Sequence, residues 1–100
     1  AVMCAAISPY QSTRDEVQTM IGTDKFILVH VNTPLEVCEK RDVKGLYAKA
    51  RSGELRNFTG IDDPYEVPQN PNLSLETTIK SPEENAQIII DYLHKKAFLR

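Results

Sequence analysis

Residues 42–62 read DVKGLYAKARSGELRNFTGID, and this stretch decides how the whole chain is interpreted. Together with the two residues before it, the stretch places six cations within 17 residues, against two acids. The cations are Lys40, Arg41, Lys44, Lys49, Arg51 and Arg56. The chain as a whole has a net charge of −2, so this basic segment stands out from an otherwise acidic protein. Three glycines and an aromatic residue favour a loop that closes over phosphate or sulfate, although such charge runs more often form a solvated surface helix.

Three further motifs flank this stretch. Residues 7–10 read ISPY and are followed by Arg14-Asp15, residues 33–42 read TPLEVCEKRD, and residues 63–71 read DPYEVPQNP. With residues 42–62 as a lid, this set of motifs resembles the adenylylsulfate kinase family, and the resemblance covers roughly residues 3–93. Several linked motifs in the family's order are far more specific than any one of them.

Apolar runs alternate with helix signals along the chain. Ala1–Ile7 and Phe26–Val31 have the character of strands buried on both faces, and residues 73–75 form a short strand candidate. Helix starts are expected at Thr13, Thr33 and Ser81, because each is followed three residues later by Glu. This alternation indicates an α/β fold with a parallel sheet.

The helices are also expected to have defined ends and faces. The first should end at Gly22, the second near Arg41, a further helical piece should cover Val43–Ser52 up to Gly53, and the last should end near Lys95. Residues 58–72 are rich in Gly, Pro, Asp and Asn and predict an extended loop. The expected apolar face of the first helix comprises Val17, Met20 and Ile21, and that of the last helix Ala86, Ile89, Ile90 and Leu93.

The resemblance implies that the chain is the C-terminal half of a P-loop kinase-type parallel sheet flanked by helices. No G-x-x-x-x-G-K-[ST] phosphate loop occurs in residues 1–100, so the central strand that carries it is expected to be missing from this fragment. Ala1–Ile7 and Phe26–Val31 should then be parallel, unpaired and separated by the width of that strand. Residues 1–100 would form half of one kinase domain, with a lid at about 42–62, and would not be stable alone.

The resemblance also implies which residues meet adenylyl sulfate. They are Ile7, Ser8, Lys44, Asn57 and Phe58. Ser8 and Lys44 are the candidate catalytic residues, although no general base is visible beside Ser8 and a turn serine bonded to local backbone is an equal alternative. Phe58 is expected to pack on the adenine of adenylyl sulfate, since a polar, glycine-rich loop offers it no obvious core. Asn57 stands where the family has Gly, and Asn tolerates a positive φ better than other non-glycine residues.

The expected ATP contacts are Arg41, Thr78 and Lys80. Arg41 should end a helix, where a cation also stabilises the helix dipole. In the family the matching arginine lies over the adenine of ATP, where the flat guanidinium can stack. Two other departures from the family pattern lie in the lid: Ala48 stands in place of a Lys, which removes one charge, and Arg56 replaces a Lys.

The implied activity is transfer of the γ-phosphate of ATP to the ribose 3′-hydroxyl of adenylyl sulfate, which makes 3′-phosphoadenylyl sulfate in sulfate assimilation. Mg²⁺ is expected with ATP, with its ligands outside this fragment and no metal site within it. The alternative is a non-catalytic, kinase-like domain of a sulfate adenylyltransferase that binds phosphoadenylyl sulfate as an allosteric regulator. The intact lid favours the enzyme, although the fragment alone should be inactive. A homodimer, and fusion to or association with a sulfate adenylyltransferase, are compatible with either alternative.

Composition argues against other classes of protein. No run is apolar enough to span a bilayer, no signal sequence opens the chain, and its acidic balance argues against nucleic-acid binding. Cys4 and Cys38 have neither disulfide nor metal spacing and are expected to be buried thiols of a cytoplasmic protein. His30 is expected to be structural, and Asp62 to brace the lid through turn hydrogen bonds.

Overall fold

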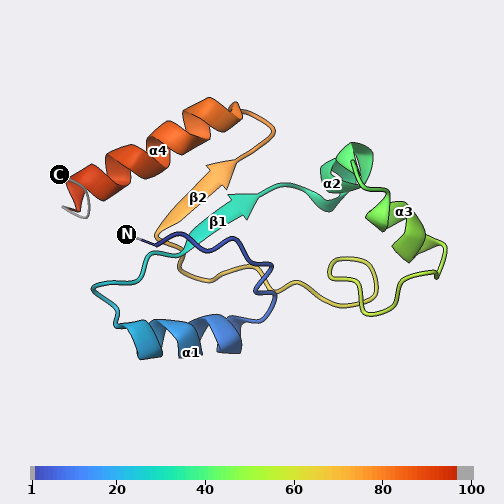
Figure 1. Cartoon of the computed structure of the whole chain (residues 1–100), viewed down its shortest axis with the longest axis horizontal. Coiled ribbons are helices and arrows are strands. Elements are labelled where there is room, and N and C mark those ends of the chain that lie inside the picture. Colours follow the sequence, from blue (N-terminus) through green and yellow to red (C-terminus); the bar gives the residue numbers. More distant parts are fainter. Residues whose placement is uncertain (1, 97–100) are drawn as a thin grey trace.

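The computed structural model describes residues 2–96 and is an open α/β arrangement around one pair of strands (Figure 1). Its elements are α1 (Gln11–Ile21), β1 (Val29–Asn32), α2 (Leu35–Arg41), α3 (Leu46–Arg51), β2 (Leu73–Glu76) and α4 (Pro82–Lys95). The strands pair in parallel, with Val29 opposite Leu73 and Asn32 opposite Glu76. In Figure 1, α1 and α4 lie on opposite sides of the strand pair, while α2, α3 and the following loop extend beyond the strands' C-terminal ends. The predicted parallel α/β fold with flanking helices is confirmed.

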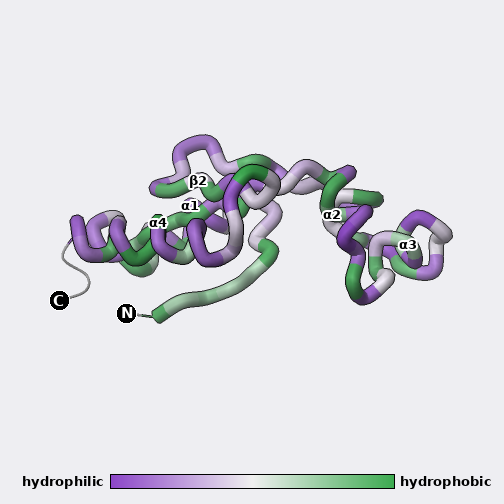
Figure 2. Tube along the Cα trace, turned by 90° about the horizontal axis from the view of Figure 1, so that it is seen from above, coloured by the Kyte–Doolittle hydropathy of each residue, from purple (hydrophilic) through white to green (hydrophobic). Residues whose placement is uncertain are grey.

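The described part of the N-terminal apolar run, residues 2–7, does not form the predicted strand. The segment has no regular secondary structure and is exposed, with 92% of Val2 open to solvent. Figure 2 shows it as an apolar stretch that runs apart from the strand pair. A strand needs a neighbour for its N–H and C=O groups, and no backbone hydrogen bond joins residues 2–7 to residues 26–31. A separating strand between these two segments remains a prediction.

The described residues bury very little apolar surface. Ala50, Leu75 and Pro68 are the only buried apolar residues among positions 2–96. Cys4 is exposed and Cys38 half-buried, so the expectation of two buried thiols is wrong for Cys4. Leu75 lies on β2, against which α4 packs, whereas Ala50 lies on α3.

Helix α1 begins and packs differently from the sequence prediction. It starts at Gln11 instead of Thr13, and Tyr10 precedes it without a side-chain cap, so the predicted Thr13–Glu16 capping box is wrong. Its end at Gly22, with a φ of 104°, is as predicted. Val17, Met20 and Ile21 are exposed, because no described element covers them, whereas Arg14 is buried.

The helices α2 and α3 are shorter than predicted. Helix α2 begins at Leu35, and the Thr33 hydroxyl is hydrogen-bonded to the Thr77 hydroxyl instead of capping the helix. The predicted helical piece Val43–Ser52 is reduced to Leu46–Arg51. Gly53 follows with a φ of 83°, a conformation that suits glycine at the end of a helix.

Helix α4 begins with the capping box that the sequence predicts. The Ser81 hydroxyl accepts from the Glu84 N–H at 3.2 Å, and the Ser81 N–H donates to Glu84 Oε1 at 3.0 Å. The bond from the Ser81 N–H, and then the Ser81 side chain, favour the ionised carboxylate and lower the pKa of Glu84 below its ordinary value of 4.5. The inward face differs from the predicted one, because Asn85 is buried while Ala86 and Ile90 are exposed.

Substituting Ser81 by Ala should lower the free energy of unfolding of the folded protein by about 1 kcal/mol, because the Glu84 N–H loses its side-chain acceptor. Ser81→Asp keeps a side-chain acceptor and should stay close to the unaltered protein. Urea unfolding of the three proteins checks this. Because Glu84 has a lowered pKa, its contribution is present above about pH 4.5 and is lost as the pH falls through the folded-state value. Acid should therefore destabilise all three proteins, because each keeps the N–H at position 81 that binds this carboxylate, and an equal loss from both substitutions would contradict a capping role.

Candidate functional site

A groove lies at the C-terminal ends of the two parallel strands, the edge at which such sheets bind ligands. Its volume is about 360 Å³. The residues that line it are Val31, Arg41, Leu75, Thr77, Lys80, Pro82 and Asn85. Val31 and Leu75 are register partners and supply apolar surface, while Arg41 and Lys80 supply positive charge. The groove can therefore accept a ligand with an apolar ring and an anionic group.

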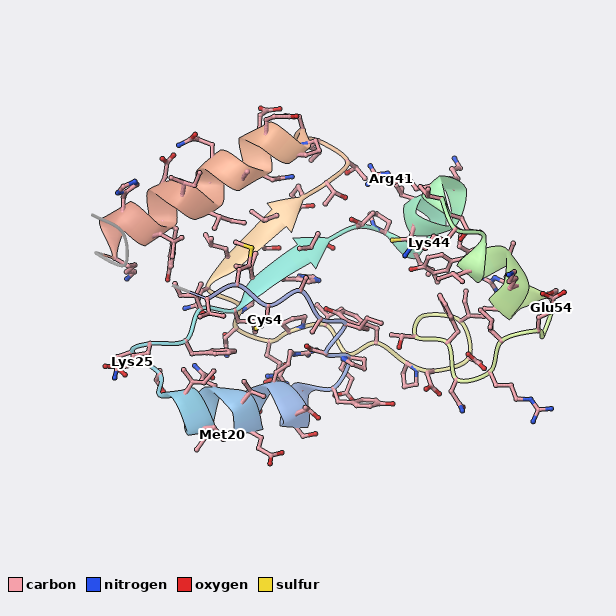
Figure 3. All side chains as sticks on the ribbon, in the orientation of Figure 1. Cys4, Met20, Lys25, Arg41, Lys44 and Glu54 are labelled. Carbon is pink, nitrogen blue, oxygen red and sulfur yellow. The ribbon has the colours of Figure 1, made fainter. Side chains whose placement is uncertain are left out.

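Arg41 is held in place at this groove. Its Nη1 donates to Thr77 Oγ1 at 3.3 Å and its Nη2 to the Thr77 carbonyl at 3.1 Å. Figure 3 shows Arg41 at the start of the lid region, near the loop that follows β2. Of the three predicted ATP residues, Arg41 and Lys80 line the same groove, whereas Thr78 is exposed and does not line it. Thr77 lines it instead.

Asn85 is a residue of this groove that sequence reasoning missed. It is 8% exposed, and its Nδ2 donates to the Glu76 carbonyl at 3.4 Å. Its Oδ1 is buried without a hydrogen-bond partner among the described residues. A buried, unpaired acceptor is costly, so this oxygen is a candidate to receive a hydrogen bond from a ligand. The only sequence signal was an amide within an otherwise apolar helical pattern.

The turn between α2 and α3 carries Lys44. The Asp42 N–H donates to the Cys38 carbonyl at the end of α2, while the Asp42 carboxylate accepts from the N–H groups of Tyr47 at 2.9 Å and Ala48 at 3.0 Å. Asp42 thus joins both helices, and its negative charge suits the N-terminus of α3. Lys44 is exposed in this turn, between the strand ends and the tip of the lid in Figure 3.

Phe58 and Asn57 lie in a loop that Asp62 braces, as predicted. The Asp62 carboxylate accepts from the N–H of Asn57 at 2.5 Å and from the N–H of Phe58. Asn57 has a φ of 55°, the left-handed conformation considered for this position. The Phe58 ring packs edge-to-face on Tyr47, with 5.0 Å between ring centroids. Phe58 therefore has a packing partner in α3, contrary to the expectation that it had no core to join.

Arg51 and Tyr47, both on α3, interact with side chains of α2. Arg51 Nη2 and Glu39 Oε1 form an ion pair at 2.6 Å, and the carboxylate raises the pKa of Arg51. Burial raises the pKa of Tyr47, and the neighbouring Cys38 adds to this effect. Lys49 projects from the same helix and is exposed. Helix α3 and the turn before it thus present cations on their surface, while α3 stays attached to α2.

The turn that carries Ile7 and Ser8 lies on a different part of the molecule. Ile7 is 68% exposed, and Ser8 has a φ of 45°, which costs a non-glycine residue about 1–3 kcal/mol. The Ser8 carbonyl accepts from Arg14 Nη1 at 2.5 Å. Arg14 was visible in the sequence only as part of a motif, and its buried position was not foreseen. The structure does not bring Ser8 into contact with the groove of Arg41 and Lys80.

Other kinds of site find little support in the part of the chain that the structure describes. Within residues 2–96, no three His, Cys, Asp or Glu side chains gather as metal ligands. No helix there is long and apolar enough to cross a bilayer. His30 is buried, and its ring stacks on Tyr65 with a centroid separation of 6.3 Å, in agreement with its predicted structural role.

Known proteins resemble this chain over nearly its whole length. A family model described as adenylylsulphate kinase matches residues 1–76. The adenylyl-sulfate kinase of Halothermothrix orenii is 57% identical over 97 residues, which are 97% of this chain and 51% of that protein. The corresponding protein of Rippkaea orientalis is 52% identical over 98 residues, or 98% of this chain and 53% of that protein. The bifunctional enzyme NodQ of Azospirillum brasilense is 47% identical across 95% of this chain and 15% of its own length.

A solved structure agrees with these sequence relatives. The structure of the Mycobacterium tuberculosis APS kinase CysC in complex with AMPPNP and APS has a TM-score of 0.84 and 48% identity. The likeness covers 89% of this chain and 52% of that one, so the chain spans about half the length of the relatives it matches. The parallel strands and flanking helices are those of the P-loop kinase-type fold. On these grounds the chain belongs to the adenylylsulphate kinase family.

Proposed function

We propose that the protein carrying this chain transfers the γ-phosphate of ATP to the ribose 3′-hydroxyl of adenylyl sulfate. The observation that carries the proposal is the close likeness to an APS kinase solved with AMPPNP and APS together. Residues 1–100 would supply the lid and part of both nucleotide sites. The remaining part of the kinase domain, with the phosphate loop and its central strand, would cover the apolar surfaces that are exposed in the described residues.

The groove at the strand ends is the proposed ATP side of the site. Arg41, already oriented by Thr77, would lie against the adenine, and Lys80 would meet negative charge. The unpaired Asn85 Oδ1 would accept a hydrogen bond from the adenine amino group. Thr78 remains a predicted ATP residue, although Thr77 occupies the groove in its place.

The lid and the N-terminal turn are the proposed adenylyl sulfate side. Phe58 would pack on the base, with Asn57 beside it, and Ile7 and Ser8 would contact the substrate from the turn. Lys44 is exposed in the turn that joins the two lid helices, where its ammonium group could reach an anionic substrate. A compact ammonium charge suits a sulfate or phosphate oxygen. A nucleophilic role for Ser8 is the weaker alternative, because no hydrogen-bonded general base lies at its hydroxyl in the described structure.

In phosphoryl transfer, the main roles of the protein are to position the reactants and to supply positive charge around the transferred group. The residues described here fit the first role: they bind the two nucleotides and orient them. They do not gather a carboxylate set for Mg²⁺. That Mg²⁺ is bound with ATP by groups outside this chain remains a prediction.

A non-catalytic regulatory domain is the alternative function, and sulfate adenylyltransferase is the proposed assembly partner. NodQ, a relative described as bifunctional, is much longer than this chain, which is compatible with a fusion to sulfate adenylyltransferase. A protein that binds phosphoadenylyl sulfate yet does not phosphorylate adenylyl sulfate would favour the regulatory domain. The homodimer and the cytoplasmic location remain predictions.

Replacing Phe58 by Ala in the full-length protein should weaken use of adenylyl sulfate far more than use of ATP. Base–aromatic contacts contribute about 1–3 kcal/mol, which corresponds to roughly a five- to hundredfold change. Arg41→Ala should show the reverse preference and raise the KM for ATP. Steady-state kinetics with each substrate varied in turn measures both effects.

Val43→Ala is the matched control for these two variants, because Val43 lies in the turn between α2 and α3, close to Arg41 in the sequence, and is 96% exposed. It should leave both KM values unchanged. Equal effects of Phe58→Ala and Arg41→Ala on both substrates would show that the residues act through lid stability, and the two-sided site would have to be abandoned.

Lys44→Gln should lower kcat/KM for adenylyl sulfate by about ten- to hundredfold, since a charged hydrogen bond contributes about 1.5–3 kcal/mol. Lys49→Gln is the matched control: it removes the same charge from an exposed position on α3 and should change kcat/KM by less than about threefold. Similar losses in both variants would point to a general effect of lid charge instead of a specific contact by Lys44.

A further inference from the structure

We propose that Arg14 is a positioning residue for adenylyl sulfate, which clamps the turn at Ser8 to the segment that follows the lid at Glu66. The inference rests on the proposed function, because it concerns the same substrate. Arg14 touches neither nucleotide in this proposal. It acts through the backbone of the turn that carries Ile7 and Ser8.

The clamp consists of hydrogen bonds from one guanidinium to two distant backbone segments. Arg14 Nη1 donates to the Ser8 carbonyl at 2.5 Å, and Nη2 donates to the Glu66 carbonyl at 2.5 Å. A direct backbone bond runs beside them, from the Glu66 N–H to the Pro9 carbonyl at 2.7 Å. Residues 52 positions apart in the sequence are therefore joined at the edge of the proposed site.

Only an arginine can make this set of contacts. Its planar fork presents several donors in fixed directions, so it can reach both carbonyls at once, whereas a lysine ammonium is a single point of charge. Arg14 Nη2 also donates to Gln11 Oε1 at 3.1 Å, and the guanidinium lies 5.8 Å from the Tyr65 ring centroid. Tyr65 in turn stacks on His30 of β1, so Arg14 and Tyr65 together connect the turn to the sheet.

Stability alone does not account for this residue. Arg14 is 4% exposed and has no carboxylate partner within salt-bridge distance among residues 2–96. Its Nε is buried without a hydrogen-bond partner there. A buried guanidinium without an ion pair is expensive, and an apolar side chain of similar size would cost less. The contacts that it does make are directed at the turn.

The turn needs such a clamp because its backbone is strained. Ser8 combines a φ of 45° with a proline as the next residue, and both features restrict its backbone. Residues in this region keep their conformation only where the surroundings fix them. Without Arg14, Ser8 would relax toward an extended backbone, and the surface that it shares with Ile7 would shift away from the substrate.

The test uses Arg14→Gln and Arg14→Lys in the full-length protein. Arg14→Gln should raise the KM for adenylyl sulfate on the order of tenfold to a hundredfold, since displacing a positioning group by about 1 Å can have an effect of this size. The KM for ATP should stay nearly unchanged. Arg14→Lys keeps the charge without the fork and should recover only part of the loss. Amide hydrogen exchange at Glu66, measured without substrate, should become faster in both variants.

Ser81→Ala is the control for a general loss of stability, because it weakens α4 and does not touch the turn. It should leave the KM for adenylyl sulfate unchanged. Unchanged exchange at Glu66 in the Arg14 variants would overturn the clamp, and faster exchange with no selective change in that KM would overturn its substrate role. If the unaltered protein does not act on adenylyl sulfate, the proposed function fails and this role fails with it. An active protein with unchanged kinetics in the Arg14 variants overturns the role of Arg14 alone.

Discussion

The parallel pairing of β1 with β2 is the constraint on which the rest of the structure depends. Two parallel strands cannot be joined by a tight turn, so the chain must leave β1, travel back and enter β2 from the same end. Residues 33–72 are that connection, and they contain α2, α3 and the loop with Phe58. The predicted basic lid at about 42–62 is thus part of this crossover, which the fold places beyond the strand ends, near the groove that Arg41 and Lys80 line.

Local signals in the sequence predicted the structure where the partners are also local. Ser81 and Glu84 form their capping box because both partners lie within one helical turn. The same signal failed at Thr13, since the Gln11 N–H finds an acceptor in Glu66 Oε1 at 2.8 Å and the helix begins earlier. It failed again at Thr33, whose hydroxyl bonds to Thr77. Hydrogen-bond partners far away in the sequence are found at both helix starts, and no local pattern reveals them.

For the candidate site too, the sequence predicted some features and missed others. Arg41 and Lys80 were both predicted as ATP contacts, and the structure brings both to one groove. They did not indicate that Asn85 would be buried there, or that the Phe58 ring would rest on Tyr47. Those facts depend on which face of a helix meets the sheet and on how a loop folds back. Side-chain identity suggests the chemistry of a site, whereas burial and partners require the three-dimensional arrangement.

The double role of Asp42 has a consequence for the entropy of ligand binding. Because Asp42 ends α2 with its N–H and caps α3 with its carboxylate, and because Glu39 holds Arg51, the two helices form one preorganised body. A lid built in this way would close over a nucleotide as a rigid piece. The backbone freedom lost on binding would then be confined to the segments at its ends, so more of the binding energy would remain available for affinity.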